Sequence, residues 1–152
     1  MKVGIVSGYF NPLHLGHVQY LYASRERCDM LVAIVNNDKQ VKLKGAREFM
    51  NEQHRCKIIQ SLKPVDVTIL SVDTDKSVCN SIRKVKKIFP DDELVFFNSG
   101  DRTSDNLNNS ESLTCQELNI EQCIINLTKI CSSSSLLENI VTNEKKNINH
   151  GN

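Results

Sequence analysis

One turn decides the fold, and it reads Gly8-Tyr9-Phe10-Asn11-Pro12-Leu13-His14-Leu15-Gly16-His17. Residues 2–7, which precede it, form a short apolar run that predicts a buried strand. Residues 15–27, which begin within it, carry apolar side chains close to helical spacing. A buried strand, a turn with glycines and a helix in direct succession indicate the beginning of an alternating α/β domain.

The same alternation continues along the chain. Four further strands are predicted at residues 29–36, 65–72, 93–98 and 122–127, and further helices at residues 51–62, 75–89, 113–118 and 132–140. Asn51 is suited to cap the helix that follows it, and the polar residues 37–50 and 99–112 are expected to be loops. This order predicts a doubly wound, mainly parallel five-stranded sheet in a single α/β domain, residues 1–140. The polar tail, residues 141–152, is expected to be disordered.

The composition argues against several classes of protein. The chain of 152 residues has 19 Lys and Arg against 18 Asp and Glu, a net charge of +1. A dedicated nucleic-acid binder or a polybasic membrane binder usually has a basic excess. No apolar run approaches the roughly 18 residues of a membrane span. We therefore expect neither a nucleic acid nor a membrane as partner, and a cytoplasmic location.

The six cysteines are scattered, at positions 28, 56, 79, 115, 123 and 131, and form no C-x-x-C pair. In a cytoplasmic chain this spacing predicts reduced thiols rather than a disulfide framework or a zinc site. No metal held by the protein alone is expected.

The loops with unusual composition all follow predicted strands. They are residues 8–16, 36–47, 98–102 and 129–135. In an open parallel sheet, ligands bind beyond the carboxyl ends of the strands, near the point where the strand order reverses. These loops are therefore expected to converge on one site.

His14 and His17 are the first candidate site residues. They are three positions apart where the turn meets the helix, so both lie on one face of the first helical turn. A helix N-terminus favours phosphate, and two imidazoles add donors for oxygens whose charge grows in a transition state. A capping histidine or a metal-binding pair are alternatives. The sequence has neither the phosphate-binding G-x-x-x-x-G-K-[ST] motif nor the dinucleotide G-x-G-x-x-G motif.

Three other segments could also bind an anionic ligand. Ser132, Ser133 and Ser134, with Lys129 beside them, precede a predicted helix; Lys42, Lys44 and Arg47 lie in the loop after the second strand; and Asp101 and Arg102 follow the fourth strand. Taken singly, such segments are usually a capped loop, a solvated charge run and an ordinary turn.

Taken together, these segments resemble the cytidylyltransferase-like nucleotidyltransferases. The turn 8–17 is similar to the signature G-x-F-D-x-x-H-x-G-H of that family. The other matching segments are residues 35–38, 43–45, 49–55, 65–66, 99–102 and 129–134, in the family's order. The resemblance is nearest to the heptose 1-phosphate adenylyltransferase and glycerol-3-phosphate cytidylyltransferase branch.

The resemblance implies a Rossmann-like fold, usually in a homodimer, and a defined reaction. A phosphate oxygen of a small phosphorylated acceptor attacks the α-phosphorus of a nucleoside triphosphate, and pyrophosphate leaves. The resemblance further implies that His14 and His17 stabilise the pentavalent phosphorus, that Lys44 holds the α-phosphate and the acceptor phosphate, and that Mg²⁺ accompanies the nucleotide.

The remaining residues carried over by the resemblance are binding or supporting ones. Those expected at the nucleotide or acceptor are Gly8, Tyr9, Phe10, Asn11, Gly16, Asp38, Asp101, Arg102, Ser132, Ser133 and Ser134, and Arg55 and Lys129 are expected to support them.

Three points stay open at the level of sequence. The nucleotide is expected to be CTP or ATP, with CTP the family's commonest choice. The acceptor is expected to be a sugar phosphate, a polyol phosphate or a phosphonate, or FMN in an adenylyltransferase of that type. Because Asn11 and Ser99 differ from the residues usual in the family, a nucleotide-binding module without catalysis is the alternative of another class.

Overall fold

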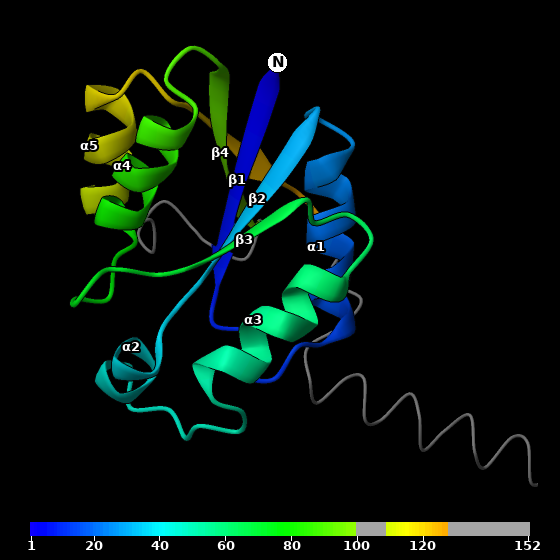
Figure 1. Ribbon diagram of the computed structural model, residues 1–152, viewed down its shortest axis with the longest axis vertical. Helices are drawn as coiled ribbons and strands as arrows, with labels where there is room; N and C mark the ends of the chain where they lie inside the picture. Colours follow the sequence, from blue (N-terminus) through cyan, green and yellow to red (C-terminus); the bar gives the residue numbers. More distant parts are fainter. Residues whose placement is uncertain (100–108, 128–152) are drawn as a thin grey trace, which may run out of the picture.

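The computed structural model describes residues 1–99 and 109–127. Ten elements follow one another along these residues (Figure 1): β1 (Lys2–Gly8), α1 (Leu15–Arg25), β2 (Met30–Val35), α2 (Asp38–Leu43), α3 (Glu52–Ser61), β3 (Val67–Leu70), α4 (Cys79–Ile88), β4 (Glu93–Ser99), α5 (Asn109–Glu117) and β5 (Glu121–Ile125). No helix in this described part is long and apolar enough to cross a membrane.

The five strands form one sheet in the order β3-β2-β1-β4-β5, and every neighbouring pair is parallel. The predicted five-stranded α/β architecture is confirmed, and the sheet is parallel throughout. The chain leaves β1 toward β2 and β3, then returns to the other side of β1 for β4 and β5. The order therefore reverses between β1 and β4, which is where ligands bind in sheets of this kind.

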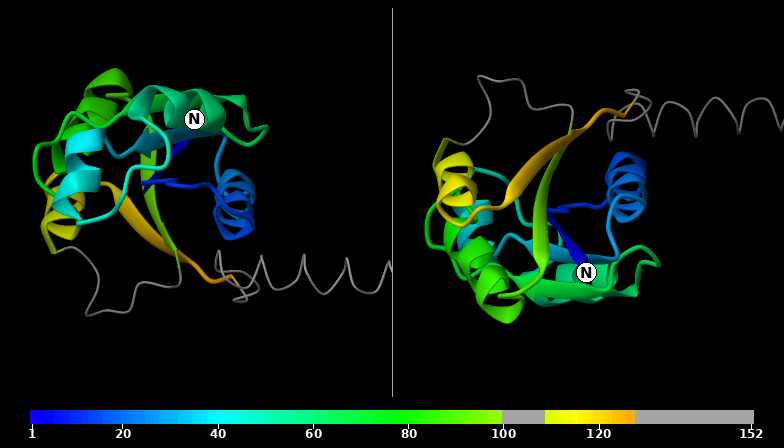
Figure 2. Two further views of the ribbon diagram at one scale, coloured as in Figure 1. Left: turned by 90° about the horizontal axis from the view of Figure 1, so that it is seen from below. Right: turned by 90° about the horizontal axis from the view of Figure 1, so that it is seen from above.

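Helices cover both faces of the sheet. α1 lies on one side, and α4 and α5 lie on the other, in the view of Figure 1 and from below and above in Figure 2. The strands alternate accordingly: in β2, Val32 and Ile34 join the core under α4 and α5, whereas Leu31, Ala33 and Val35 join the core under α1 and α3. Because both faces are covered, β2 is apolar at every position.

The segment predicted as a loop at residues 37–50 contains a helix, α2, and that prediction was wrong. The Asn37 side chain accepts a hydrogen bond from Gln40 N, and the Gln40 side chain accepts one from Asn37 N, a reciprocal capping box. The buried Gln40 also donates to the carbonyls of Asp75 and Ser77. Capping and these tertiary bonds stabilise a helix too short and too polar to show apolar periodicity.

Other boundaries differ modestly from the sequence prediction. Asn51 caps α3 as expected, accepting a hydrogen bond from His54 N. α4 begins at Cys79 rather than at residue 75, because Asp75 and Ser77 form a local turn. α5 begins at Asn109 rather than at residue 113. The helix predicted at residues 132–140 and the tail at residues 141–152 lie outside the described residues.

Candidate functional site

The turn between β1 and α1 is folded back on itself at Phe10. This residue has a φ of 50°, in the left-handed region, and its side chain is 2% exposed. Its ring lies so close to Gly8 that a Cβ on Gly8 would be 2.8 Å from Phe10 Cζ. Gly8 is therefore required by the close approach of the ring, and the ring edge in turn contacts His17, with ring centres 5.1 Å apart.

The two histidines form the start of α1. His14 is the N-cap residue, and its Nδ1 accepts a hydrogen bond from Gly16 N at 3.1 Å. His17 Nδ1 accepts one from His14 N at 3.2 Å, so two imidazoles make a reciprocal capping box. Because each Nδ1 is an acceptor, the proton of each neutral ring is on Nε2. Both rings thus keep an N–H donor beside the positive end of the helix dipole.

The electrostatic environment keeps His17 neutral. Its pKa is lowered from 6.5 to about 4, first by burial and then by the electrostatic influence of the neighbouring His14 ring and of the Lys44 ammonium group. A neutral His17 donates one directed hydrogen bond through Nε2 and presents no full positive charge. A neutral His17 can therefore donate to a phosphate oxygen without being repelled by the Lys44 ammonium group.

Lys44 brings a full positive charge close to the turn after β1. It follows α2 as its C-cap residue, and its Nζ lies 4.3 Å from the centre of the Tyr9 ring. The helix stops there because the next residue, Gly45, has a φ of 77°. α2 and the turn after β1 both lie beyond the carboxyl ends of neighbouring strands (Figure 1), and Lys44 at the end of α2 is close to Tyr9 in that turn.

Arg55 joins the segments that carry the site. Its side chain, on α3, is completely buried, and it donates to the carbonyl oxygens of Tyr9, Asn36 and Met50. It also forms an ion pair with Asp38, with 2.9 Å between Nη2 and Oδ1. The carbonyls of Tyr9 and Asn36 belong to the turns after β1 and β2. One guanidinium therefore fixes the spacing of the two turns, and Asp38 is engaged by Arg55.

Asn11 ties the turn after β1 to the segment between α2 and α3 at the surface. Its Nδ2 donates to the Arg47 carbonyl at 2.7 Å, and its Oδ1 accepts from Phe49 N at 2.8 Å. A carboxylate at this position could accept from Phe49 N but could not donate to Arg47. The asparagine in place of the family's usual aspartate therefore has a structural reason in this chain.

The structure brings several of the predicted residues into one region: Gly8, Tyr9, Phe10, Asn11, His14, Gly16, His17, Asp38, Lys44 and Arg55. The others, Asp101, Arg102, Lys129, Ser132, Ser133 and Ser134, lie outside the described residues. The sequence prediction missed the buried Gln40, although a glutamine three residues after Asn37 is itself a capping-box signal.

Within residues 1–99 and 109–127, no three His, Cys, Asp or Glu side chains gather as a metal site would require. The five cysteines there are free. Burial raises the pKa of Cys28 and of Cys56, and raises that of Cys115 to about 12. These three thiols are protonated at neutral pH, and a protonated thiol is a poor nucleophile and metal ligand.

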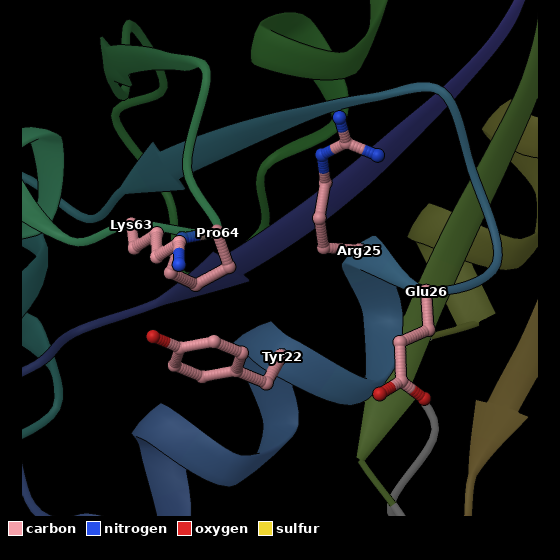
Figure 3. A pocket seen from close by; sticks show the side chains of 5 residues that line it. All are labelled: Tyr22, Arg25, Glu26, Lys63 and Pro64. Carbon is pink, nitrogen blue, oxygen red and sulfur yellow. The ribbon is translucent and has the colours of Figure 1, made fainter.

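A hollow lies at the C-terminal end of α1, at the edge of the sheet where the strands begin, and Figure 3 shows the residues that line it. Tyr22, Arg25 and Glu26 from the end of α1, with Lys63 and Pro64 from the segment before β3, line it. Arg25 in this wall is already paired with Asp66, at 3.0 Å. Because α1 runs from the histidine pair to this edge, the hollow is separate from the candidate site.

The cytidylyltransferase-like family matches residues 5–139 of this chain. The FAD synthase of Ferroglobus placidus is 32% identical, over 93% of this chain and 90% of that protein. The bifunctional protein HldE of Rhodopseudomonas palustris is also 32% identical, over 91% of this chain but 26% of that protein, so the chain spans about a quarter of that relative.

Among solved structures, the lipopolysaccharide core biosynthesis protein from Thermoplasma volcanium superimposes with a TM-score of 0.64 and 26% identity. The superposition covers 84% of this chain and 97% of that one. The similarity to this protein and to the FAD synthase therefore extends over most of the length of each pair.

Proposed function

The chain belongs to the cytidylyltransferase-like family of nucleotidyltransferases, and on that premise we propose that it transfers the adenylyl group of ATP to a small phosphomonoester. The observation that carries the proposal is the stacked pair of His14 and His17 at the N-terminus of α1, beside Lys44. Two imidazole donors, a helix N-terminus and an ammonium group together suit the oxygens of a phosphate.

The similar proteins favour ATP over CTP as the nucleotide donor. They also make FMN the first acceptor to test. FAD consists of FMN joined to AMP through a pyrophosphate linkage, so an FAD synthase needs an adenylyl donor and the phosphate of FMN as acceptor. The FAD synthase of Ferroglobus placidus matches this chain over nearly its full length. A sugar phosphate, the acceptor type implied by the resemblance to heptose 1-phosphate adenylyltransferases, is the second acceptor to test. It ranks second because HldE matches this chain over only a quarter of its own length.

The proposed reaction is an in-line displacement at phosphorus. An oxygen of the acceptor phosphate forms a bond to the α-phosphorus, and the bond from the α-phosphorus to the bridging oxygen of the β-phosphate breaks. That bridging oxygen takes the electron pair and leaves with pyrophosphate. Nothing is oxidised or reduced, so catalysis consists of positioning the reactants and stabilising charge.

The residues divide that work by their chemistry. Nε2–H of His14 and of His17 donates to the equatorial oxygens of the α-phosphate, which gain charge in the transition state. Lys44 attracts the two phosphates that must approach each other despite their like charges. Arg55 is assigned no contact with the phosphates; it joins the turn after β1, which leads to His14, to the turn after β2, which leads into α2 and Lys44.

Mg²⁺ and a homodimer are part of the same proposal. The described residues gather no metal-ligating cluster, so the triphosphate oxygens rather than these side chains would hold the ion. When bound there, Mg²⁺ would neutralise part of the phosphate charge. Light scattering of the purified protein measures the assembly, and a monomer at working concentration would contradict the dimer.

Pyrophosphate release tests the proposal. ATP and CTP are each combined with FMN, a sugar 1-phosphate or glycerol 3-phosphate, with Mg²⁺ present. We expect release only with ATP and an acceptor together, and FMN to be the best acceptor. The His17→Gln variant, which keeps an N3 side chain able to accept from His14 N, is expected to bind ATP but turn over at least about 100-fold more slowly. Nucleotide binding without release on any acceptor would instead identify a non-catalytic nucleotide-binding module.

A further inference from the structure

The contact between Lys44 and Tyr9 joins two segments that the sequence separates by more than thirty residues. Lys44 is exposed, and its Nζ lies 4.3 Å from the centre of the Tyr9 ring. This distance is within the range at which an ammonium group is attracted to the face of an aromatic ring. The Lys44 charge also reaches His17, because it contributes to lowering the pKa of that imidazole.

The backbone of Tyr9 is held firmly at this place. Arg55 Nη1 donates to the Tyr9 carbonyl at 2.8 Å, and the Arg55 side chain is completely buried. The neighbouring Phe10 is also buried, with its ring against Gly8 and His17. The backbone at Tyr9 is therefore well anchored, and its ring offers a contact surface to the exposed Lys44 side chain.

We propose that Tyr9 is a positioning residue, whose ring face holds the Lys44 ammonium beside the histidine pair before a phosphate binds. This inference rests on the proposed function, in which Lys44 attracts the phosphates. It adds a role for Tyr9 that the family signature does not contain, because the signature leaves this position open.

The advantage of an aromatic partner for Lys44 is clear from a comparison with two alternatives, a lysine without any partner and a lysine paired with a carboxylate. A free lysine loses rotamer entropy when it is immobilised, which weakens its binding to a phosphate. A carboxylate would immobilise it too, but would compete with the phosphate for its charge. An aromatic face orients the ammonium while leaving its charge and its remaining N–H donors available.

The first test observes the contact without any turnover. In protein labelled with ¹³C-lysine, the Lys44 ε-methylene signal, identified by its loss in Lys44→Met, is expected to be shifted upfield by the Tyr9 ring. The upfield shift is expected to persist in Tyr9→Phe, which keeps the ring, and to disappear in Tyr9→Leu. Tyr22→Leu removes an exposed tyrosine from the far end of α1 and is the matched control; it is expected to leave the signal in place.

The second test measures the consequence for the reaction. Because an exposed cation–π contact is worth about 0.5–1 kcal/mol, Tyr9→Leu is expected to lower kcat/KM for ATP about two- to fivefold. Tyr9→Phe, which keeps the ring, is expected to lose less than Tyr9→Leu, and the control Tyr22→Leu is expected to stay near the wild-type value. In the Lys44→Met background, Tyr9→Leu is expected to have no further effect, because the residue that Tyr9 positions is already absent.

Two results would overturn the inference. One is an unchanged Lys44 signal in Tyr9→Leu; the other is an equal loss of kcat/KM in Tyr9→Leu whether or not Lys44 is present, which would indicate a general effect on folding. Failure of the proposed function is distinguishable, since it would appear as absence of pyrophosphate release in the wild type, while the spectroscopic test of the contact needs no reaction.

Discussion

The imidazole of His17 is stacked on that of His14, with ring centres 3.8 Å apart and ring planes 24° apart. Each ring also accepts a backbone hydrogen bond at the start of α1. The same two side chains therefore cap the helix and supply the donors that the proposed chemistry needs. Stability and turnover are linked at these positions, but suitable substitutions can separate them.

His14→Asn is expected to keep the helix cap and remove the Nε2 donor. Asparagine is among the best N-cap residues, whereas alanine cannot cap, so His14→Ala is expected to cost about 1 kcal/mol of stability and His14→Asn much less. Both variants are expected to lose at least about 100-fold in kcat. Urea unfolding and pyrophosphate release measure the two effects. Wild-type turnover in His14→Asn would show that His14 acts only as a cap.

The low pKa of His17 predicts a loss of stability in acid. Its folded-state pKa of about 4 lies below its ordinary value of 6.5, so between these values the unfolded state binds more protons. The contribution of His17 is complete above pH 6.5 and declines as the pH falls toward about 4. His17→Gln does not titrate, so the difference in melting temperature between wild type and variant is expected to narrow in acid. Parallel curves for the two proteins would contradict the lowered pKa.

Arg55→Met is expected to be strongly destabilising. The substitution leaves the Tyr9, Asn36 and Met50 carbonyls without their donor and Asp38 without its partner, at a cost of about 3 to 5 kcal/mol. Arg83→Met is the matched control. Arg83 pairs with Glu117 on the surface, with both side chains more than 40% exposed, and its loss is expected to cost no more than about 1 kcal/mol. Equal losses in urea unfolding of the two variants would refute the role of Arg55.

Gly8→Ala is expected to disturb His17 through the Phe10 ring. The new Cβ would lie 2.8 Å from Phe10 Cζ, and that ring, 2% exposed, has little space in which to move. We expect a loss of about 1 to 3 kcal/mol and a changed imidazole signal of His17 in NMR spectra. At Gly45, where nothing lies within 4 Å but φ is 77°, alanine is expected to cost about 1 kcal/mol through backbone strain alone. An unchanged His17 signal in Gly8→Ala would contradict this coupling.

The amino-acid sequence determined the frame of the protein. Apolar runs such as the one in β2 predict strands covered on both faces, and their alternation with helices leads to a parallel sheet whose loops meet at one edge. The placement of His14 and His17 at the beginning of a helix also followed from the sequence, because capping and spacing are local properties.

Only the tertiary structure decided how the segments at that edge engage one another. The pairing of Arg55 with the turns after β1 and β2, the bonds of Asn11 across to Arg47 and Phe49, and the position of Lys44 on the Tyr9 ring all join residues more than fifteen positions apart. α2 likewise depends on the bonds from Gln40 to Asp75 and Ser77. Such contacts depend on chain packing in three dimensions, which periodicity and local propensity do not encode, so the sequence identified the candidate residues while the fold arranged them.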